Sequence, residues 1–278
     1  MTRPKRKTHL QTLRGIRRPW IVADWGSLRA LPKGAGLPGT ASIMLPDIAL
    51  SEMVGSERPE VYFDKLNGLV FHPTAAGRIV VGRYWNDISN DERHPSDVVP
   101  HSIAAAHVEL TRNLLQAQRA RRLFTYTPGG DDTEQRRAGF LKLVNGFSAW
   151  MQAEHPERVH ALRGDPEALP ASIKGPTAFM GKLIIRVNPR YDTPAWRAAA
   201  NTFPDKCAAA RWMRTICWYA NLRVSLPDQS DEKFGNNYED AHYVFLSLYT
   251  GHLWTRDRQM ARAALGVSGG RVAVHREL

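Results

Sequence analysis

The clearest hydrophobic pattern lies near the C-terminal end of the chain, where a helical period changes into a short apolar run. Apolar residues recur at steps of three and four, at Ala241, Val244, Phe245 and Leu248. This spacing predicts a helix with one buried face, and Gly251 stands where a helix end favours a residue that tolerates positive φ. The tripeptide Leu253-Trp254-Thr255 is too short for a helix and predicts a strand buried in a parallel sheet.

Shorter segments elsewhere alternate between strand-like and helix-like patterns. The expected strands are 20–24, 78–82 and 271–274, and the expected helices are 61–70 and 258–266. Residues 43–45 are expected to be extended and to lead into a helix that begins at Pro46, because proline is favoured at the first position of a helix. Residues 31–42 are rich in Gly and Pro and predict a surface loop without a phosphate-binding signature. Together these elements predict an α/β fold with four or five parallel strands.

Residues 89–230 form a long middle region with a mostly helical pattern. Its expected elements are helices over 96–122, 132–153 and 204–224 and a strand over 182–187. Trp196, Trp212 and Trp218 are candidates for stacking on nucleic-acid bases, although core packing is the simpler interpretation of each. The sequence therefore predicts a helical segment beside the sheet without indicating what that segment does.

The composition is that of a folded protein without a membrane span. A chain of 278 residues with 43% hydrophobic residues can build one or two packed domains. It contains no run of about 18 apolar residues, and no apolar segment of a signal peptide follows its basic start. Cys207 and Cys217 fall in one expected helix, which favours free thiols, and no Cys/His set has zinc-ligand spacing. We therefore expect a cytoplasmic protein without structural zinc.

The charge balance favours an anionic partner. The formal net charge is +11, and residues 1–18 hold seven Lys and Arg residues and no acid. A basic arm of this kind binds a phosphate backbone with salt-sensitive affinity, whereas the simpler alternative is a solvated tail. The expected nucleic-acid contacts in the arm are Lys5, Arg6, Lys7, Arg17 and Arg18.

Four acidic residues stand at positions where the expected elements begin or end. Asp24 follows the first strand, Glu52 lies on the first long helix, Asp240 opens the late helix and Asp257 follows the late strand. Functional groups of open α/β sheets gather at the carboxyl ends of the strands, so these side chains could converge at one edge. Taken singly, each acid is more simply a helix cap, a turn residue or an exposed side chain.

The order and surroundings of these acids resemble the PIN-domain family of metal-dependent nucleases. Thr255-Arg256-Asp257 is similar to the family's last strand end, and Glu239-Asp240-Ala241 is similar to the start of its late helix. The resemblance implies a three-layer α/β/α core with a central parallel sheet, formed by 19–88 and 231–278. Typical PIN domains are much shorter, so 89–230 would be a mainly helical insertion, and 1–18 would be the flexible arm.

The resemblance also implies chemistry. Asp24 and Asp257 would contact Mg²⁺ or Mn²⁺ directly, Glu52 and Asp240 would hold the metal or its waters, and Thr255 would orient Asp257 or a water. Glu239 stays an alternative to Asp240 as the third acid. A hard divalent ion takes oxygen ligands and activates water for phosphodiester hydrolysis. No Ser/His/Asp nucleophile set is visible, which argues against acyl transfer.

The expected function is therefore metal-dependent endoribonuclease activity, of a toxin or of an antiviral-defence component, with an inhibitor protein or a second copy of the chain as further partners. RNA is favoured over DNA through the resemblance alone. Three alternatives stay open: a non-catalytic nucleic-acid-binding protein, a protein-interaction subunit on a PIN-like scaffold, and a structure-specific DNA nuclease.

Overall fold

A computed structural model describes most of the two ends of the chain and part of its middle. The described residues are 20–32, 42–70, 78–82, 133–157, 192–198 and 208–277, together with His72 and Val159. None of the helices in these ranges combines the length and the apolar character that a membrane span requires.

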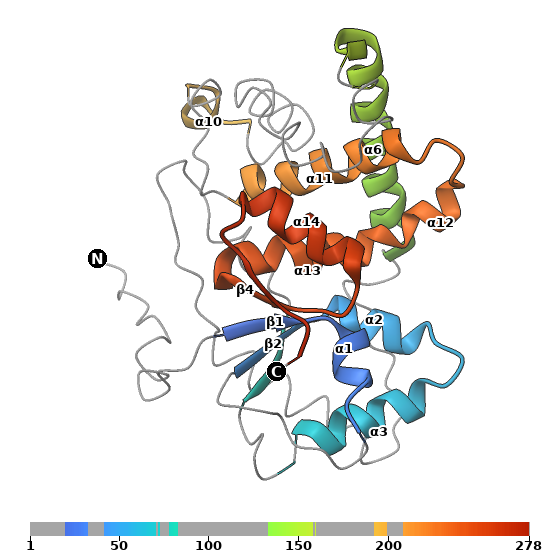
Figure 1. Cartoon of the computed structure of the whole chain (residues 1–278), viewed down its shortest axis with the longest axis vertical. Coiled ribbons are helices and arrows are strands. Elements are labelled where there is room, and N and C mark those ends of the chain that lie inside the picture. Colours follow the sequence, from blue (N-terminus) through green and yellow to red (C-terminus); the bar gives the residue numbers. More distant parts are fainter. Residues whose placement is uncertain are drawn as a thin grey trace.

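Five parallel strands form a sheet in the order β3-β2-β1-β4-β5 (Figure 1). The strands are β1 (Trp20–Ala23), β2 (Ser42–Pro46), β3 (Ile79–Gly82), β4 (His252–Trp254) and β5 (Ala273–His275). Every residue of β2 is buried, and so are three of the four residues of β1. Continuous burial of this kind explains why the strands read as unbroken apolar runs, since a parallel sheet is covered on both faces.

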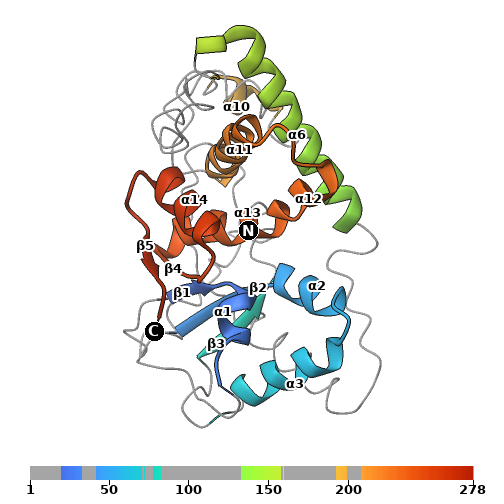
Figure 2. The same ribbon diagram turned by 45° about the vertical axis from the view of Figure 1, so that its right-hand side comes forward.

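Nine helices surround the sheet in the described ranges. They are α1 (Trp25–Arg29), α2 (Ile48–Val54), α3 (Pro59–Val70), α6 (Thr133–Glu154), α10 (Pro194–Ala198), α11 (Ala208–Ser225), α12 (Asp231–Gly235), α13 (Asn237–Thr250) and α14 (Arg258–Ser268). Figures 1 and 2 show α11, α13 and α14 on one side of the sheet and α3 on the other.

The direction in which the chain builds the sheet reverses at β1. From β1 the strands proceed through β2 to β3, whereas β4 and β5 are added on the opposite side of β1. Parallel crossovers are right-handed, so this reversal sends the helices of the two halves to opposite faces. The carboxyl ends of β1 and β4 therefore flank a topological switch point, the usual place for a binding site in an open α/β sheet.

Helix α13 is buried along most of its length and lies against β1 and β4. Gly251 ends it in the left-handed conformation, with φ of 74°, and the chain turns directly into β4. Glycine adopts this conformation without the steric cost that a side chain brings. The turn fixes α13 relative to the strand that precedes Asp257.

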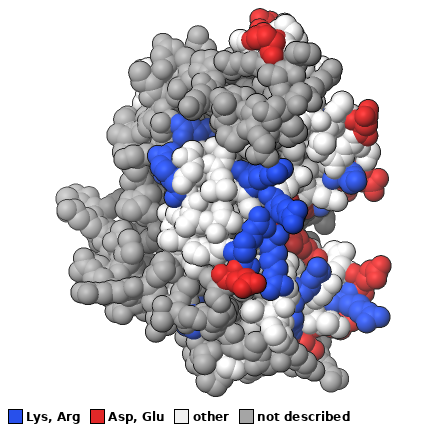
Figure 3. All heavy atoms as spheres, in the orientation of Figure 1, with Lys and Arg blue, Asp and Glu red and all other residues white. Residues whose placement is uncertain are grey.

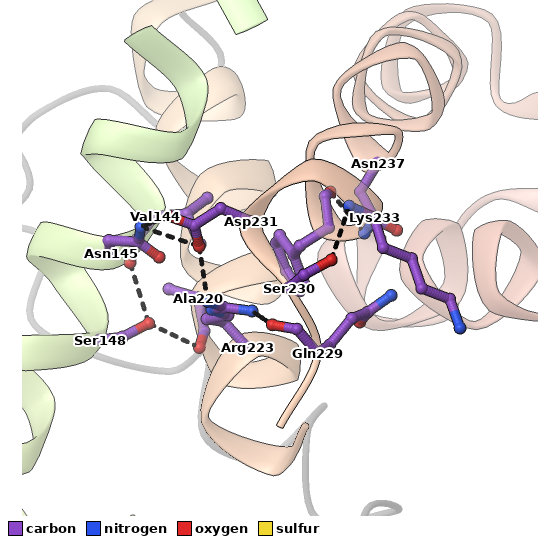
Figure 4. A network of polar contacts seen from close by, with 11 residues as sticks. Val144, Asn145, Ser148, Ala220, Arg223, Gln229, Ser230, Asp231, Lys233 and Asn237 are labelled. Carbon is purple, nitrogen blue, oxygen red and sulfur yellow. Dashed lines mark hydrogen bonds and ion pairs between the residues drawn. The ribbon is translucent and has the colours of Figure 1, made fainter. Parts of the chain in front are cut away.

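The described helices of the middle region contribute buried side chains to the same hydrophobic core as the strands. Helix α11 packs against α6 on one side and against α13 and α14 on the other. Polar contacts reinforce the α6–α11–α12 junction (Figure 4): Ser148 Oγ donates to the carbonyl of Ala220 at 3.0 Å, and Arg223 pairs with Asp231 at 2.6 Å. The middle region is thus joined to the helices of the site.

Most of the predicted elements are confirmed. The structure contains the strands predicted at 20–24 and 253–255, as β1 and β4, and the all-parallel sheet. It also contains the helices predicted near 61–70, 132–153, 204–224 and 258–266. Trp196 and Trp218 are 1% exposed, so the core interpretation of these two residues is correct and neither offers a face for base stacking. Trp212 is partly buried and packs on His242, with ring centroids 5.1 Å apart.

Two predictions about element boundaries were wrong. Pro46 is the last residue of β2 rather than the first of a helix, and α2 begins at Ile48. Proline is tolerated there because the ladder ends at that point. The closing strand starts at Ala273, not at residue 271, because Gly269 and Gly270 both adopt positive φ and Val272 is buried before the strand begins.

Several predicted features lie outside the described residues. They are the basic arm 1–18 with its Lys and Arg contacts, most of the loop 31–42, the helix 96–122, the strand 182–187 and Cys207. Cys217 is a buried free thiol.

Candidate functional site

The ends of β1 and β4 bring two of the predicted acids to the switch point. Ala23 pairs with Trp254 in the ladder, so Asp24 and Thr255 follow on adjacent strands. The backbone continues this pairing, since the amide of Asp24 donates to the carbonyl of Trp254 at 3.1 Å. Asp257 comes two residues after Thr255 and caps α14. The parallel register thus places both aspartates at one edge of the sheet.

Asp24 is buried, and both oxygens of its carboxylate accept hydrogen bonds from Ser27, three residues later in the chain. Oδ1 accepts a hydrogen bond from the amide of Ser27 at 3.0 Å, and Oδ2 accepts one from Ser27 Oγ at 2.8 Å. This is an N-cap of α1, in which an acidic side chain satisfies an amide that has no helical partner. The orientation of the Asp24 carboxylate is therefore set locally.

Ser27 also ties the two strand ends together. Its Oγ accepts a hydrogen bond from the amide of Arg256 at 2.9 Å while it donates to Asp24. Sequence reasoning did not identify Ser27. The local signal was an Asp at the cap with a Ser three residues later, but the contact with Arg256, 229 positions away, left no trace in the sequence.

Asp257 is exposed, and its neighbours hold its backbone and its side chain. Its Oδ1 accepts from the amide of Met260 at 2.7 Å, and its own amide donates to Thr255 Oγ1 at 3.0 Å. Thr255 is fully buried. Its hydroxyl thus fixes the turn that presents the Asp257 carboxylate.

Glu52 reaches the same region from α2. Its Oε1 accepts a hydrogen bond from Tyr243 Oη at 2.8 Å, and Trp25 N donates to the same hydroxyl at 3.4 Å. The pKa of Glu52 is raised to about 8, mainly by burial and in smaller part by the charges of Asp240, Glu239 and Asp24, while the Tyr243 hydrogen bond opposes the shift. Tyr243 is a second residue of the site that the sequence did not reveal.

Asp240 is electrostatically coupled to all the other acids. It is half-buried in the first turn of α13. Its pKa is raised to about 8, mainly by burial and in smaller part by the charges of Asp257, Asp24 and Glu239. Asp240 in turn raises the pKa of Glu52. Asp240 thus lies near each of the other three predicted acids, because like charges disfavour ionisation only at short range.

Glu239 has a different partner. Its carboxylate forms an ion pair with Arg137 of α6, and the side chain is buried. Burial raises the pKa of Glu239, and Arg137 opposes the shift. The Arg137 side chain packs closely over Gly235, where a Cβ would lie only 3.1 Å from Arg137 Cδ. The geometry thus favours Asp240 over Glu239 as the acid directed to Asp24 and Asp257.

The candidate ligands at this edge of the sheet are carboxylate oxygens. Among the described side chains, no group of three His, Cys, Asp or Glu residues is placed as ligands of one ion. Mg²⁺ is commonly held by one or two direct carboxylates together with several waters, so a three-ligand group is not required. The available donors are carboxylate oxygens, the type such ions prefer, and a nearby cation would lower the raised pKa values.

Exposed arginines border the acids. Arg256 and Arg258 flank Asp257, Arg262 lies one turn further along α14, and Arg276 Nη1 donates to the carbonyl of Arg256 at 2.8 Å. Figure 3 shows a band of Lys and Arg over the face that α14 and the C-terminal segment occupy in Figure 1. An acidic site beside a basic band suits a substrate that carries repeated negative charge.

No protein-family model, curated protein or solved structure matches this chain.

The glycine after Trp25 permits a test of carboxylate placement that leaves every acid in place. A Cβ at Gly26 would lie 2.8 Å from Asp24 Oδ1. We expect Gly26→Ala to displace this carboxylate and to lower metal-dependent cleavage by about 10–100-fold, the usual effect of disturbing the support of a metal ligand. Thermal stability should fall only slightly, because the loss of the Asp24 cap of α1 costs about 1 kcal/mol and the higher helix propensity of alanine partly offsets it.

Gly68→Ala in α3 is the matched control, since a Cβ there meets nothing within 4 Å. Cleavage rates and melting curves of both variants provide the comparison. Equal activity of Gly26→Ala and the wild type would show that the position of the Asp24 carboxylate does not matter.

Proposed function

We propose that this protein is a divalent-metal-dependent nuclease with a PIN-like core. The observation that carries the proposal is the meeting of the acids at the switch point of a parallel sheet: Asp24 and Asp257 follow the adjacent ends of β1 and β4, and Glu52 is hydrogen-bonded to α13, the helix that carries Asp240. Burying acids together is unfavourable unless a cation compensates them. Their positions also follow the order implied by the resemblance.

The chemistry assigned to the site is phosphodiester hydrolysis. A Mg²⁺ or Mn²⁺ ion at these carboxylates would supply an activated water and would neutralise the charge that develops on the phosphate. Asp24 and Asp257 are the proposed direct ligands, and Glu52 and Asp240 hold the ion or its waters. Ser27, Thr255 and Tyr243 position these carboxylates through the hydrogen bonds described above. The arginine band supports a nucleic-acid substrate, and RNA is proposed on the resemblance to PIN nucleases.

The test is cleavage of end-labelled single-stranded RNA, single-stranded DNA and duplex DNA by the purified full-length chain. We expect cleavage of the RNA with Mn²⁺ or Mg²⁺ and none after chelation by EDTA. Preference for branched or flapped DNA would favour a structure-specific DNA nuclease instead. Cleavage that persists in EDTA would exclude the proposed chemistry.

A non-catalytic nucleic-acid-binding protein is the second candidate. Both oxygens of Asp24 already accept hydrogen bonds from Ser27, which is what a purely structural cap requires. This candidate predicts salt-sensitive nucleic-acid binding without cleavage, and binding that Asp24→Asn leaves intact.

A further inference from the structure

A buried hydroxyl group from the middle region lies close to the acidic site. Tyr219 of α11 is 0% exposed, and its hydroxyl has no hydrogen-bond partner among the described residues. Burying a hydroxyl without a hydrogen bond is unfavourable, so such a group generally marks a missing partner.

The packing places this tyrosine beside the helices of the site. Helix α11 lies against α13, which carries Asp240, and against α14, which begins after Asp257. The ring of Tyr219 contacts Phe140 edge-on, with centroids 5.8 Å apart, and Phe140 contacts Tyr238 in the same way at 5.8 Å. Phe140 thus connects Tyr219 with Tyr238, which lies in the first turn of α13 two residues before Asp240.

The electrostatic surroundings agree with this placement. Burial raises the pKa of Tyr219 well above its usual value, and the charges of Asp240 and Asp257 raise it further. The hydroxyl therefore keeps its proton at neutral pH and can act as a hydrogen-bond donor. Both carboxylates that contribute to this shift among the described residues belong to the proposed site.

We propose that Tyr219 is a positioning residue of the acidic site, whose hydroxyl donates a hydrogen bond to a water molecule held by Asp240 and Asp257. The inference rests on the proposed nuclease function. It gives α11, and with it the middle region, a direct part in the site. A water in that position satisfies the orphaned hydroxyl and accepts its hydrogen bond in a fixed direction.

Tyr219→Phe tests the proposal, because it removes the hydroxyl and keeps the ring. Without divalent ions the variant should melt close to the wild-type temperature, because the ring keeps its packing and the water keeps the two carboxylates as partners. Its cleavage rate should nevertheless fall by about 10–100-fold, and the Mn²⁺ concentration for half-maximal rate should rise by about tenfold. A merely structural tyrosine would show the opposite pattern, with lower stability and unchanged activity per folded molecule.

Tyr249→Phe is the control, because Tyr249 lies at the other end of α13, beneath Arg211. The increase in melting temperature on addition of Mn²⁺ is a second readout that does not require cleavage. A wild type that gains stability with Mn²⁺ but does not cleave would refute the nuclease function alone. Equal cleavage and equal Mn²⁺ response in Tyr219→Phe and an active wild type would refute the role of Tyr219 alone. A wild type without any Mn²⁺ response would refute both.

Discussion

Replacing Asp240 with asparagine should lower the rate of metal-dependent cleavage by roughly 10³-fold. Asp240 is coupled to Asp257, Asp24 and Glu52 and stands at the centre of the acidic set. Asparagine keeps the shape of the side chain and removes its charge. A metal ion contributes several kcal/mol of transition-state stabilisation, and about 4 kcal/mol corresponds to this loss of rate.

The same substitution should make the metal-free protein more stable at neutral pH. At neutral pH the folded chain holds a proton on Asp240, because its pKa is about 8, whereas the unfolded chain has released that proton at the ordinary pKa of 3.8. Asparagine removes the free-energy cost of taking up this proton on folding. Melting curves in EDTA should therefore show an equal or higher melting temperature for Asp240→Asn. Loss of activity combined with a gain in stability cannot be attributed to misfolding.

Two further variants sharpen this experiment. Glu239→Gln should lower the cleavage rate by less than about tenfold, because Glu239 is paired with Arg137 and glutamine retains an acceptor for that arginine. Asp228→Asn alters an exposed acid in the turn after α11 and should have no effect. If Glu239→Gln is inactive and Asp240→Asn is active, the third acid is Glu239 and the assignment made here is wrong.

The strand ends of the site were predictable from the sequence, because their signals are local. The sequence signals are the short apolar runs that begin at Trp20 and at Leu253, and they correspond to β1 and β4. Asp24 and Asp257 are helix caps within three residues of their partners. β2 was recognised only as an extended entry, because a proline that favours a helix start stands at its end.

The supporting contacts were not predictable, because they join distant parts of the chain. Tyr243 reaches Glu52 across 191 positions, and Arg137 reaches Glu239 across 102. Neither tyrosine nor arginine has a spacing pattern that marks such a contact. The choice between Glu239 and Asp240, two neighbours with the same charge, depends on which face of α13 meets α6, and only the packed structure provides that information.

The second large effect is a loss of stability of the metal-free protein as the pH rises from 6.5 to 8. Glu52 and Asp240 have pKa values of about 8 in the folded chain, against ordinary values of 4.5 and 3.8. The folded state therefore holds protons that the unfolded state has already released. Stability rises with pH only where the unfolded state binds more protons, so here it must fall.

If the folded chain retains one or two protons between pH 6.5 and 8, the free energy of unfolding falls by roughly 2–4 kcal/mol, at about 1.4 kcal/mol per proton and pH unit. For a protein of this size the melting temperature should fall by roughly 5–15 °C. The interval starts at 6.5 because of His242, whose pKa is lowered to about 3 by burial and by Arg136. Between pH 3 and 6.5 the unfolded chain binds a proton on His242 that the folded chain does not, so stability rises with pH in that range. Below pH 6.5 this rise masks the fall in stability that the two carboxyl groups cause.

Melting curves in EDTA at several pH values test this linkage. Glu52→Gln and Asp240→Asn should each flatten the dependence, whereas Glu57→Gln, at an exposed position after α2, should leave it unchanged. Saturating Mn²⁺ should abolish the loss in the wild type, because a bound cation favours the ionised carboxylates and binds only the folded arrangement. A wild-type melting temperature that stays constant from pH 6.5 to 8 in EDTA would mean that these carboxyl groups ionise normally, and the acids would then not form the compact, mutually repelling set on which the nuclease proposal depends.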